Sequence, residues 1–121
     1  MDGARAEPAD EGVPAYLAAL PAASRAMVER LLGLACDVVP DAAVVMSYGI
    51  PTVRSGRRRF HVGAWKHGVS VYGWHDGHDG GFTAAHPDLV HGRSTLRFSE
   101  AELAAVGDDE LRALAAATLR T

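Results

Sequence analysis

The chain has few residues of the kinds that build cross-linked or membrane-spanning proteins. Its 121 residues include a single cysteine, Cys36, which excludes an internal disulfide and a zinc site of several cysteines. A chain without disulfides is typical of the reducing cytoplasm. No apolar run approaches the ~18 residues that a membrane span needs, and residues 1–12 contain no apolar signal-peptide core. We therefore expect a cytoplasmic protein without a membrane partner.

A strong excess of one charge is also absent. Twelve basic and fifteen acidic residues give a formal net charge of −3, which argues against nucleic acid as the partner of this protein. Hydrophobic residues make up 48% of the chain and charged residues 22%, as in an ordinary globular domain. Acidic residues are missing altogether between Ala42 and His75, where five basic residues occur. The charge is therefore spread unevenly along the chain.

Residues 44–74 predict the central sheet. Apolar and polar residues alternate there, and β-branched and aromatic side chains are frequent. Residues 48–51, with their glycine and proline, must break strand geometry as a bulge or a bend. Residues 55–56 and 66–68 are further turns, and residues 94–98 alternate again as the last strand. The sheet is therefore expected to be mostly antiparallel.

Alternation also assigns side chains to faces. In the strand before the turn at residues 66–68, one face takes Phe60, Val62 and Ala64, and the other takes Arg59, His61 and Trp65. In the strand after it, Val69 and Val71 share a face opposite Ser70, Tyr72 and Trp74. In the last strand, Leu96 and Phe98 face inward.

Helices are predicted on both sides of the sheet. Residues 13–20 form a short helix and residues 22–39 a longer one, whose apolar stripe comprises Met27, Leu31, Leu34, Ala35 and Val38. After the sheet, Ser99 and Glu102 predict a capping box, and that helix ends at Gly107 as a left-handed cap. Asp108 then caps a final helix, whose inner face carries Leu111, Leu114, Ala115 and Leu119.

This layout predicts an α+β fold. A mostly antiparallel sheet of about five strands packs against the N-terminal and C-terminal helices. Residues 1–12 are expected to be a flexible tail, and residues 13–121 a single domain. No internal repeat interrupts it.

Four short motifs carry a resemblance to a known family. They are Tyr16-Leu17 with Leu20-Pro21, Pro40-Asp41-Ala42, Ser47-Tyr48-Gly49-Ile50-Pro51, and Thr95-Leu96-Arg97-Phe98. In these motifs the chain resembles the YdhG-like domain-of-unknown-function family (family 1801). One bacterial branch of that family is a frataxin-like iron chaperone, so the resemblance implies a YdhG-like fold and iron as a ligand. The chain departs from the family at Gly68, where a histidine is usual, and in the glycine- and histidine-rich segment of residues 75–91.

Two groups of residues are candidates for binding a metal. His75, Asp76, His78 and Asp79 offer imidazole and carboxylate ligands within five residues, although a plain hairpin or surface loop is the favoured account of them. Glu100, Glu102 and residues 108–110 resemble the acidic ridge through which frataxin-like proteins bind iron. Their alternative role is to offset the dipoles at two helix starts.

A small-ligand site is predicted on the sheet. Its candidate residues are the polar groups within or beside the strands, Ser47, Tyr48, Lys66, Tyr72 and Arg97. Basic residues interleaved with Trp65 and Trp74 on the same segment favour an anion or a nucleotide as the ligand. The alternatives are a solvated hairpin and purely structural roles for Lys66 and Arg97.

No catalytic motif occurs, neither a nucleophile elbow, a phosphate-binding loop, nor a dinucleotide fingerprint. The sequence therefore favours a non-enzymatic protein that binds an unknown small ligand or a metal, with iron implied by resemblance only. The two alternatives are an anion or nucleotide binder on the basic, aromatic face of the sheet, and a protein-interaction module that forms homo-oligomers.

Overall fold

The computed structural model describes residues 11–75 and 77–120. Its elements, in chain order, are α1 (Gly12–Ala18), α2 (Ala22–Val38), β1 (Ala43–Ser47), β2 (Ile50–Ser55), β3 (Arg58–Trp65), β4 (Gly68–Tyr72), α3 (Phe82–Ala85), the 3-10 helix η1 (Pro87–Leu89), β5 (Val90–Gly92), β6 (Thr95–Ser99), α4 (Glu100–Ala105) and α5 (Asp108–Arg120). The α+β prediction is confirmed. The tail predicted over residues 1–12 lies outside the described residues up to residue 10, and Gly12 already belongs to α1.

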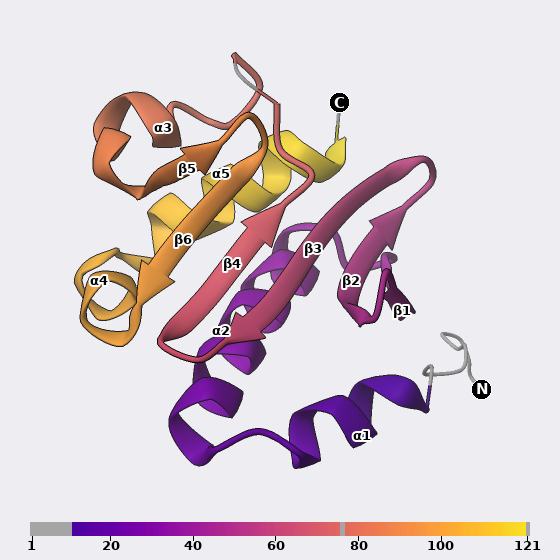
Figure 1. Ribbon diagram of the computed structural model, residues 1–121. Coiled ribbons are helices and arrows are strands. Elements are labelled where there is room, and N and C mark those ends of the chain that lie inside the picture. Colours follow the sequence, from indigo (N-terminus) through magenta and orange to yellow (C-terminus); the bar gives the residue numbers. More distant parts are fainter. Residues whose placement is uncertain (1–10, 76, 121) are drawn as a thin grey trace.

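The sheet has six strands in the order β1-β2-β3-β4-β6-β5, and every neighbouring pair is antiparallel (Figure 1). The strand that the sequence did not predict is β5, a three-residue edge strand within the glycine- and histidine-rich segment. The hairpin of β1 and β2 follows from its turn residues. Tyr48 and Gly49, with φ of 53° and 77°, form a two-residue turn of the type that matches strand twist. Ile50 and Pro51 therefore belong to β2 rather than to a bulge.

One face of the sheet is packed against α2 and α5, which lie behind it in Figure 1. The sheet contributes the buried side chains of Val53, Phe60, Val62, Val69, Val71, Leu96 and Phe98. The helices contribute the predicted inner residues Leu31, Leu34, Ala35, Leu111, Leu114, Ala115 and Leu119. Each large apolar side chain buried in this way contributes roughly 1.5–3 kcal/mol of transfer free energy. This covered face therefore holds the hydrophobic core.

Trp74 is an exception to the predicted alternation. Its side chain is 2% exposed and belongs to the core instead of sharing a face with Ser70 and Tyr72. The cause is Gly73, whose φ of 104° interrupts the extended backbone, and with it the alternation, directly after β4. A Cβ at that glycine would lie 2.3 Å from the carbonyl oxygen of Arg59, so no other residue fits there without a shift.

The start of α5 also differs from the prediction. The capping box of Ser99 and Glu102 is present at the start of α4. Gly107, however, does not have a positive φ, and α4 ends at Ala105 with Val106 extended. Asp108 is the first residue of α5 and accepts hydrogen bonds from Arg30. An arginine side chain thus replaces the left-handed cap that the sequence predicted.

The short helix α1 is attached to the sheet through one tyrosine. The hydroxyl of Tyr16 accepts a hydrogen bond from the backbone N–H of Ala64 at 2.9 Å. Arg25 of α2 donates to the carbonyl oxygens of Leu17 and Leu20 at the end of α1. These bonds hold α1 beside β1 and β2, and leave the other face of the sheet open. In the described part of the chain, no helix is long and apolar enough to cross a membrane.

Candidate ligand-binding site

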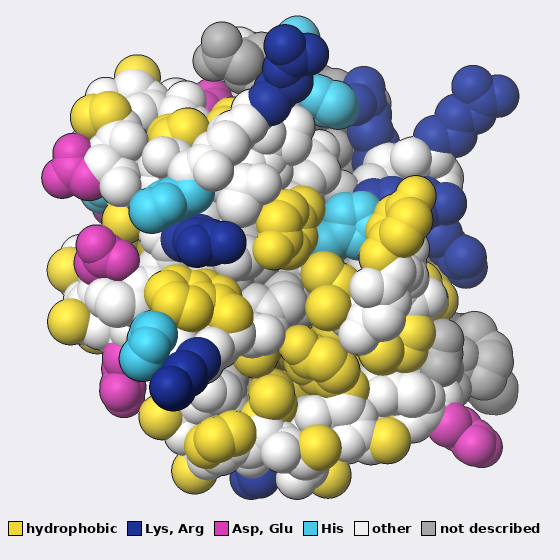
Figure 2. All heavy atoms as spheres, in the orientation of Figure 1, with side chains coloured by type: hydrophobic (Ala, Val, Ile, Leu, Met, Phe, Trp, Pro, Cys, Tyr) yellow, Lys and Arg dark blue, Asp and Glu magenta, His cyan; other side chains and the backbone are white. Residues whose placement is uncertain are grey.

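The face of the sheet that α2 and α5 do not cover carries a groove, hereafter the sheet groove. Figure 2 shows this open face, with hydrophobic side chains at its centre and a histidine beside them. The groove has a volume of about 520 Å³, which suits a small organic molecule. Its walls are formed by Tyr48, Ile50, His61, Gly63, Ala64, Trp65, Ser70, Tyr72 and Gly73.

The sheet groove is deep at its centre because two small residues face each other across β3 and β4. Gly63 is the register partner of Ser70, and a Cβ at Gly63 would lie 3.2 Å from Cγ2 of Ile50. Ser70 is only 2% exposed, and its hydroxyl has no hydrogen-bond partner among the described residues. The hydroxyl oxygen is nevertheless not one of the side-chain atoms that are sealed from solvent, so water can still reach it. Ser70 therefore offers an unused donor and acceptor at the floor.

His61 offers a second polar group. Its Nδ1 lies 2.8 Å from Oγ1 of Thr52, its neighbour on β2. Burial, and then the charge of Arg59, lower the pKa of His61 below its ordinary value of 6.5. The imidazole is thus neutral at pH 7, and its second ring nitrogen, Nε2, is left for a ligand. The ring meets Tyr48 edge-on, with centroids 5.8 Å apart.

Trp65 and Arg97 close the opposite end of the sheet groove. The guanidinium carbon of Arg97 lies 5.3 Å from the centroid of the Trp65 ring, a cation–π contact. Nε1 of Trp65 is buried without a partner in the described structure. Arg97 is also the register partner of Ser70, so a cation, an indole and the unpartnered hydroxyl are neighbours on three adjacent strands.

The open face is electropositive. None of the six strands contains an aspartate or a glutamate. Arg54 and Arg59 are direct register partners on β2 and β3, where like charges repel each other. In Figure 2 the acidic side chains lie at the margins of this face, and several basic ones gather at its upper right. An anionic ligand would relieve this repulsion.

Two of the five predicted ligand-binding residues, Tyr48 and Tyr72, line the sheet groove. Arg97 joins it through Trp65. Ser47 at the end of β1 and Lys66 in the turn between β3 and β4 do not line it. The sequence prediction missed His61 and Ser70 as site residues, whereas Trp65 was among the aromatic residues of the predicted basic, aromatic face. The sequence predicted on which face of its own strand each residue lies, but only the register between the strands brings these residues together on one surface.

The predicted metal ligands lie in the loop after β4. His75 and His78 form an isolated β-bridge, and Asp76 lies outside the described residues. Asp79 accepts hydrogen bonds from the backbone N–H groups of Gly81 and Thr83, at 3.1 and 2.9 Å, and from the Thr83 hydroxyl. Burial alone would raise the pKa of Asp79, but these bonds outweigh it and lower that pKa. Asp79 therefore holds the start of α3.

Across the described residues, no three histidine, cysteine, aspartate or glutamate side chains come together to hold a metal ion. The four-residue metal set, which includes Asp76, stays a prediction. The acidic residues of α4 and α5 mostly have partners within the chain. Glu102 completes the capping box, and Glu110 lies 2.7 Å from Nε2 of His86, which lowers the pKa of that carboxyl.

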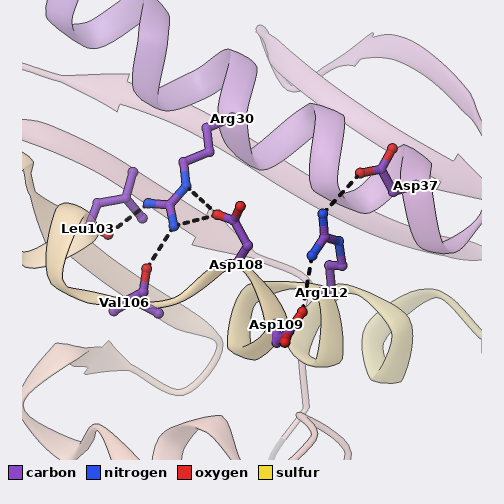
Figure 3. A network of polar contacts seen from close by, with 7 residues as sticks. All are labelled: Arg30, Asp37, Leu103, Val106, Asp108, Asp109 and Arg112. Carbon is purple, nitrogen blue, oxygen red and sulfur yellow. Dashed lines mark hydrogen bonds and ion pairs between the residues drawn. The ribbon is translucent and has the colours of Figure 1, made fainter.

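Figure 3 shows the partners of the two remaining aspartates at the start of α5. Arg30 donates to Asp108 and to the carbonyl oxygens of Leu103 and Val106, at 2.7 to 3.0 Å. Arg112 reaches Asp109 on its own helix and Asp37 on α2. These contacts support a structural role for the acidic residues at the starts of α4 and α5.

The fold and the sheet groove together define the class of this protein. It is an α+β domain whose antiparallel sheet is covered on one face and carries a candidate small-ligand site on the other. No protein-family model, curated protein or solved structure matches the chain. The resemblance to the YdhG-like family therefore stays a prediction from its motifs.

Proposed function

We propose that this protein binds a small, planar, anionic molecule in the sheet groove and does not act as an enzyme. The observation that carries the proposal is the indole N–H of Trp65, a wall residue of the groove, which is buried and has no hydrogen-bond partner among the described residues. A ligand atom that accepts a hydrogen bond from it would recover the free energy that the apo-protein forgoes.

The walls of the groove favour a flat ring. Tyr48, Trp65 and Tyr72 are aromatic, and aromatic faces bind planar rings by stacking. Tyr48 is 92% exposed and has a positive φ, a conformation that costs a non-glycine residue about 1–2 kcal/mol. Strain of this kind often occurs at binding sites. The turn that contains this residue places Tyr48 at the wall of the groove.

The charges favour an anionic group on that ring. Arg97 lies at one end of the groove, and Gly73 at the other end adjoins the repelling pair of Arg54 and Arg59. No carboxylate of the strands competes for these cations. A mononucleotide combines a flat ring, hydrogen-bonding edges and a phosphate, so we take it as the model ligand class. Iron, which the family resemblance implies, has no comparable cluster of ligands among the described residues to support it.

Fluorescence can test this proposal because the chain has only two tryptophans. In a Trp74→Phe variant, Trp65 at the groove is the sole reporter. Saturable quenching by adenosine, uridine, guanosine or cytidine monophosphate, or by flavin mononucleotide, is expected. The same ring without phosphate should bind more weakly, and inorganic phosphate should not quench.

Two matched variants locate the site. Ser70→Ala should weaken binding about fivefold or more, and Arg93→Gln, which removes an exposed cation outside the groove, should not change it. The proposal fails if no member of the panel binds, or if Ser70→Ala leaves every affinity unchanged.

A further inference from the structure

A second hollow lies at the end of the molecule where α2 and α5 terminate near the turn between β2 and β3. Its volume is about 730 Å³, and no residue lines both it and the sheet groove. Three arginines border it, Arg57 and Arg58 from the turn and Arg120 from α5. We name it the arginine cleft. Because the two sites share no residue, the role of the arginine cleft is independent of the proposed function.

Part of the lining of the arginine cleft is apolar. It includes Pro40, together with Val39 and Leu119, which are 6% and 2% exposed. Arg57 and Arg120 are exposed at its border, and neither side chain has a hydrogen bond or an ion pair with another described residue. The cleft thus combines an apolar part of its lining with two guanidinium groups whose donors are unused.

Local structure does not require an arginine at the tip of this turn. The turn places Gly56 at a φ of 59° and Arg57 at a negative φ, an arrangement that demands glycine at the first position and tolerates most residues at the second. Arg57 and Arg58 follow each other directly, and their like charges repel. An anion bound between Arg57 and Arg120 would explain why an arginine occupies this turn position.

The balance of charge agrees with an anion site. The three guanidinium groups oppose one carboxylate, Asp41, which also lines the cleft. They also oppose the carboxyl ends of α2 and α5, each equivalent to about half a negative charge. The residues that line the cleft therefore carry an excess of about one positive charge. This suits an oxyanion, which arginine binds through two parallel N–H donors.

We propose that the arginine cleft binds an organic oxyanion, a phosphate monoester or a carboxylate that carries a short apolar chain. The oxyanion lies between Arg57 and Arg120, and the short chain lies against the apolar part of the lining at Val39, Pro40 and Leu119. The shared chemistry is an anionic head on an apolar body; the two head groups are distinguished by experiment.

Amide chemical-shift titrations of the apo-protein with butyl phosphate, butyrate, inorganic phosphate and butanol test this proposal. Butyl phosphate or butyrate should shift the amides of residues 38–41, 55–58 and 119–120 and saturate, at least tenfold more tightly than inorganic phosphate or butanol. Whichever of the two binds more tightly identifies the head group. If neither saturates, or if inorganic phosphate binds equally well, the proposal is overturned.

Variants complete the test. Arg57→Gln combined with Arg120→Gln should weaken binding at least tenfold. Asp41→Asn should strengthen it severalfold, a gain that misfolding cannot imitate. Arg93→Gln and Ser70→Ala should leave it unchanged, so this site and the sheet groove can fail independently. An equal loss in Arg93→Gln would reduce the effect to non-specific charge attraction and would overturn the proposal.

Discussion

Ser70 and Thr118 are equally buried, each 2% exposed, but their hydroxyl groups have opposite surroundings. Thr118 lies in the helical layer and donates from Oγ1 to the carbonyl oxygen of Leu114 at 2.8 Å. Ser70 lies on the open face of the sheet and has no partner among the described residues. The Thr118 hydroxyl is therefore used by the fold, whereas the Ser70 hydroxyl is left for water or a ligand. The division is not complete, because Nε1 of Trp74, in the core, is also without a partner among the described residues.

The arginines follow the same division. On the helical side, Arg30 and Arg112 are satisfied by carbonyl oxygens and carboxylates from neighbouring elements. On the sheet, Arg54 and Arg59 are direct register partners without a carboxylate on any strand, and among the described residues Arg59 donates only to the carbonyl oxygens of Gly56 and Arg58. Like charges at direct register positions destabilise a sheet, so this pair lowers the stability of the open face.

The largest expected effect concerns the covered face. Phe98 is fully buried on β6 and contacts the ring of Phe82, so Phe98→Ala should lower the free energy of unfolding by about 3–5 kcal/mol. Tyr72→Ala, on the open face of the neighbouring strand, should cost less than half as much. Urea denaturation followed by circular dichroism measures both. Equal losses would contradict the division between the two faces.

The covered face could be predicted from sequence. Alternation in residues 60–71 and the stripe of α2 identify core residues such as Val62 and Leu31, because a buried surface imposes a period on the chain. Prediction fails at Trp74, since one glycine with a positive φ interrupts that period. Which face the next side chain takes after such a residue depends on the backbone torsion angle, and the pattern of residue types does not give that angle.

The sheet groove was only half predictable. Tyr48 and Tyr72 are recognisable as polar aromatic residues within strands. The floor, by contrast, consists of Gly63 and Ser70, whose importance lies in being small and opposite each other. That pairing depends on the two-residue turn at Lys66, and its exposure on the fact that no described helix covers this face; both are properties of the folded chain.

A second prediction sharpens the contrast between the arginines. Arg30→Ala should destabilise the protein by about 2–3 kcal/mol, because it leaves the carbonyl oxygens of Leu103 and Val106 without donors and Asp108 without its cation. Arg112→Ala removes only exposed ion pairs and should cost less than about 1 kcal/mol. Thermal melting of both variants gives the comparison, and a negligible loss for Arg30→Ala would show that the network in Figure 3 does not hold α4 and α5 to α2.

The third prediction is that removing the hydroxyl of Thr118 and removing that of Ser70 change the stability of the protein in opposite directions. Thr118→Val removes a satisfied hydrogen bond and should cost about 1 kcal/mol, whereas Ser70→Ala removes an unsatisfied hydroxyl and should be neutral or stabilising by up to about 1 kcal/mol. Both side chains are equally buried, so solvent exposure does not account for the difference. If Ser70→Ala is as destabilising as Thr118→Val, the hydroxyl of Ser70 contributes to folding and the comparison is broken.

The smallest expected effect is a pH dependence that belongs to the open face. The pKa of His61 is lowered in the folded protein, by burial and by Arg59, so below pH 6.5 the unfolded chain takes up a proton that the folded chain resists. Stability contributed by the neutral imidazole is therefore complete above pH 6.5 and declines as the pH falls toward the folded pKa.

His61→Gln should flatten that decline, and His91→Gln, an exposed histidine on β5, should leave it in place. Unfolding free energies measured at successive pH values down from 7 give the two slopes. Glu110, whose pKa is lowered by His86, adds a loss of the same sign at lower pH. An unchanged slope in His61→Gln would mean that its imidazole takes up a proton as readily in the folded protein as in the unfolded chain, and the groove would then present a cation instead of a neutral ring near pH 6.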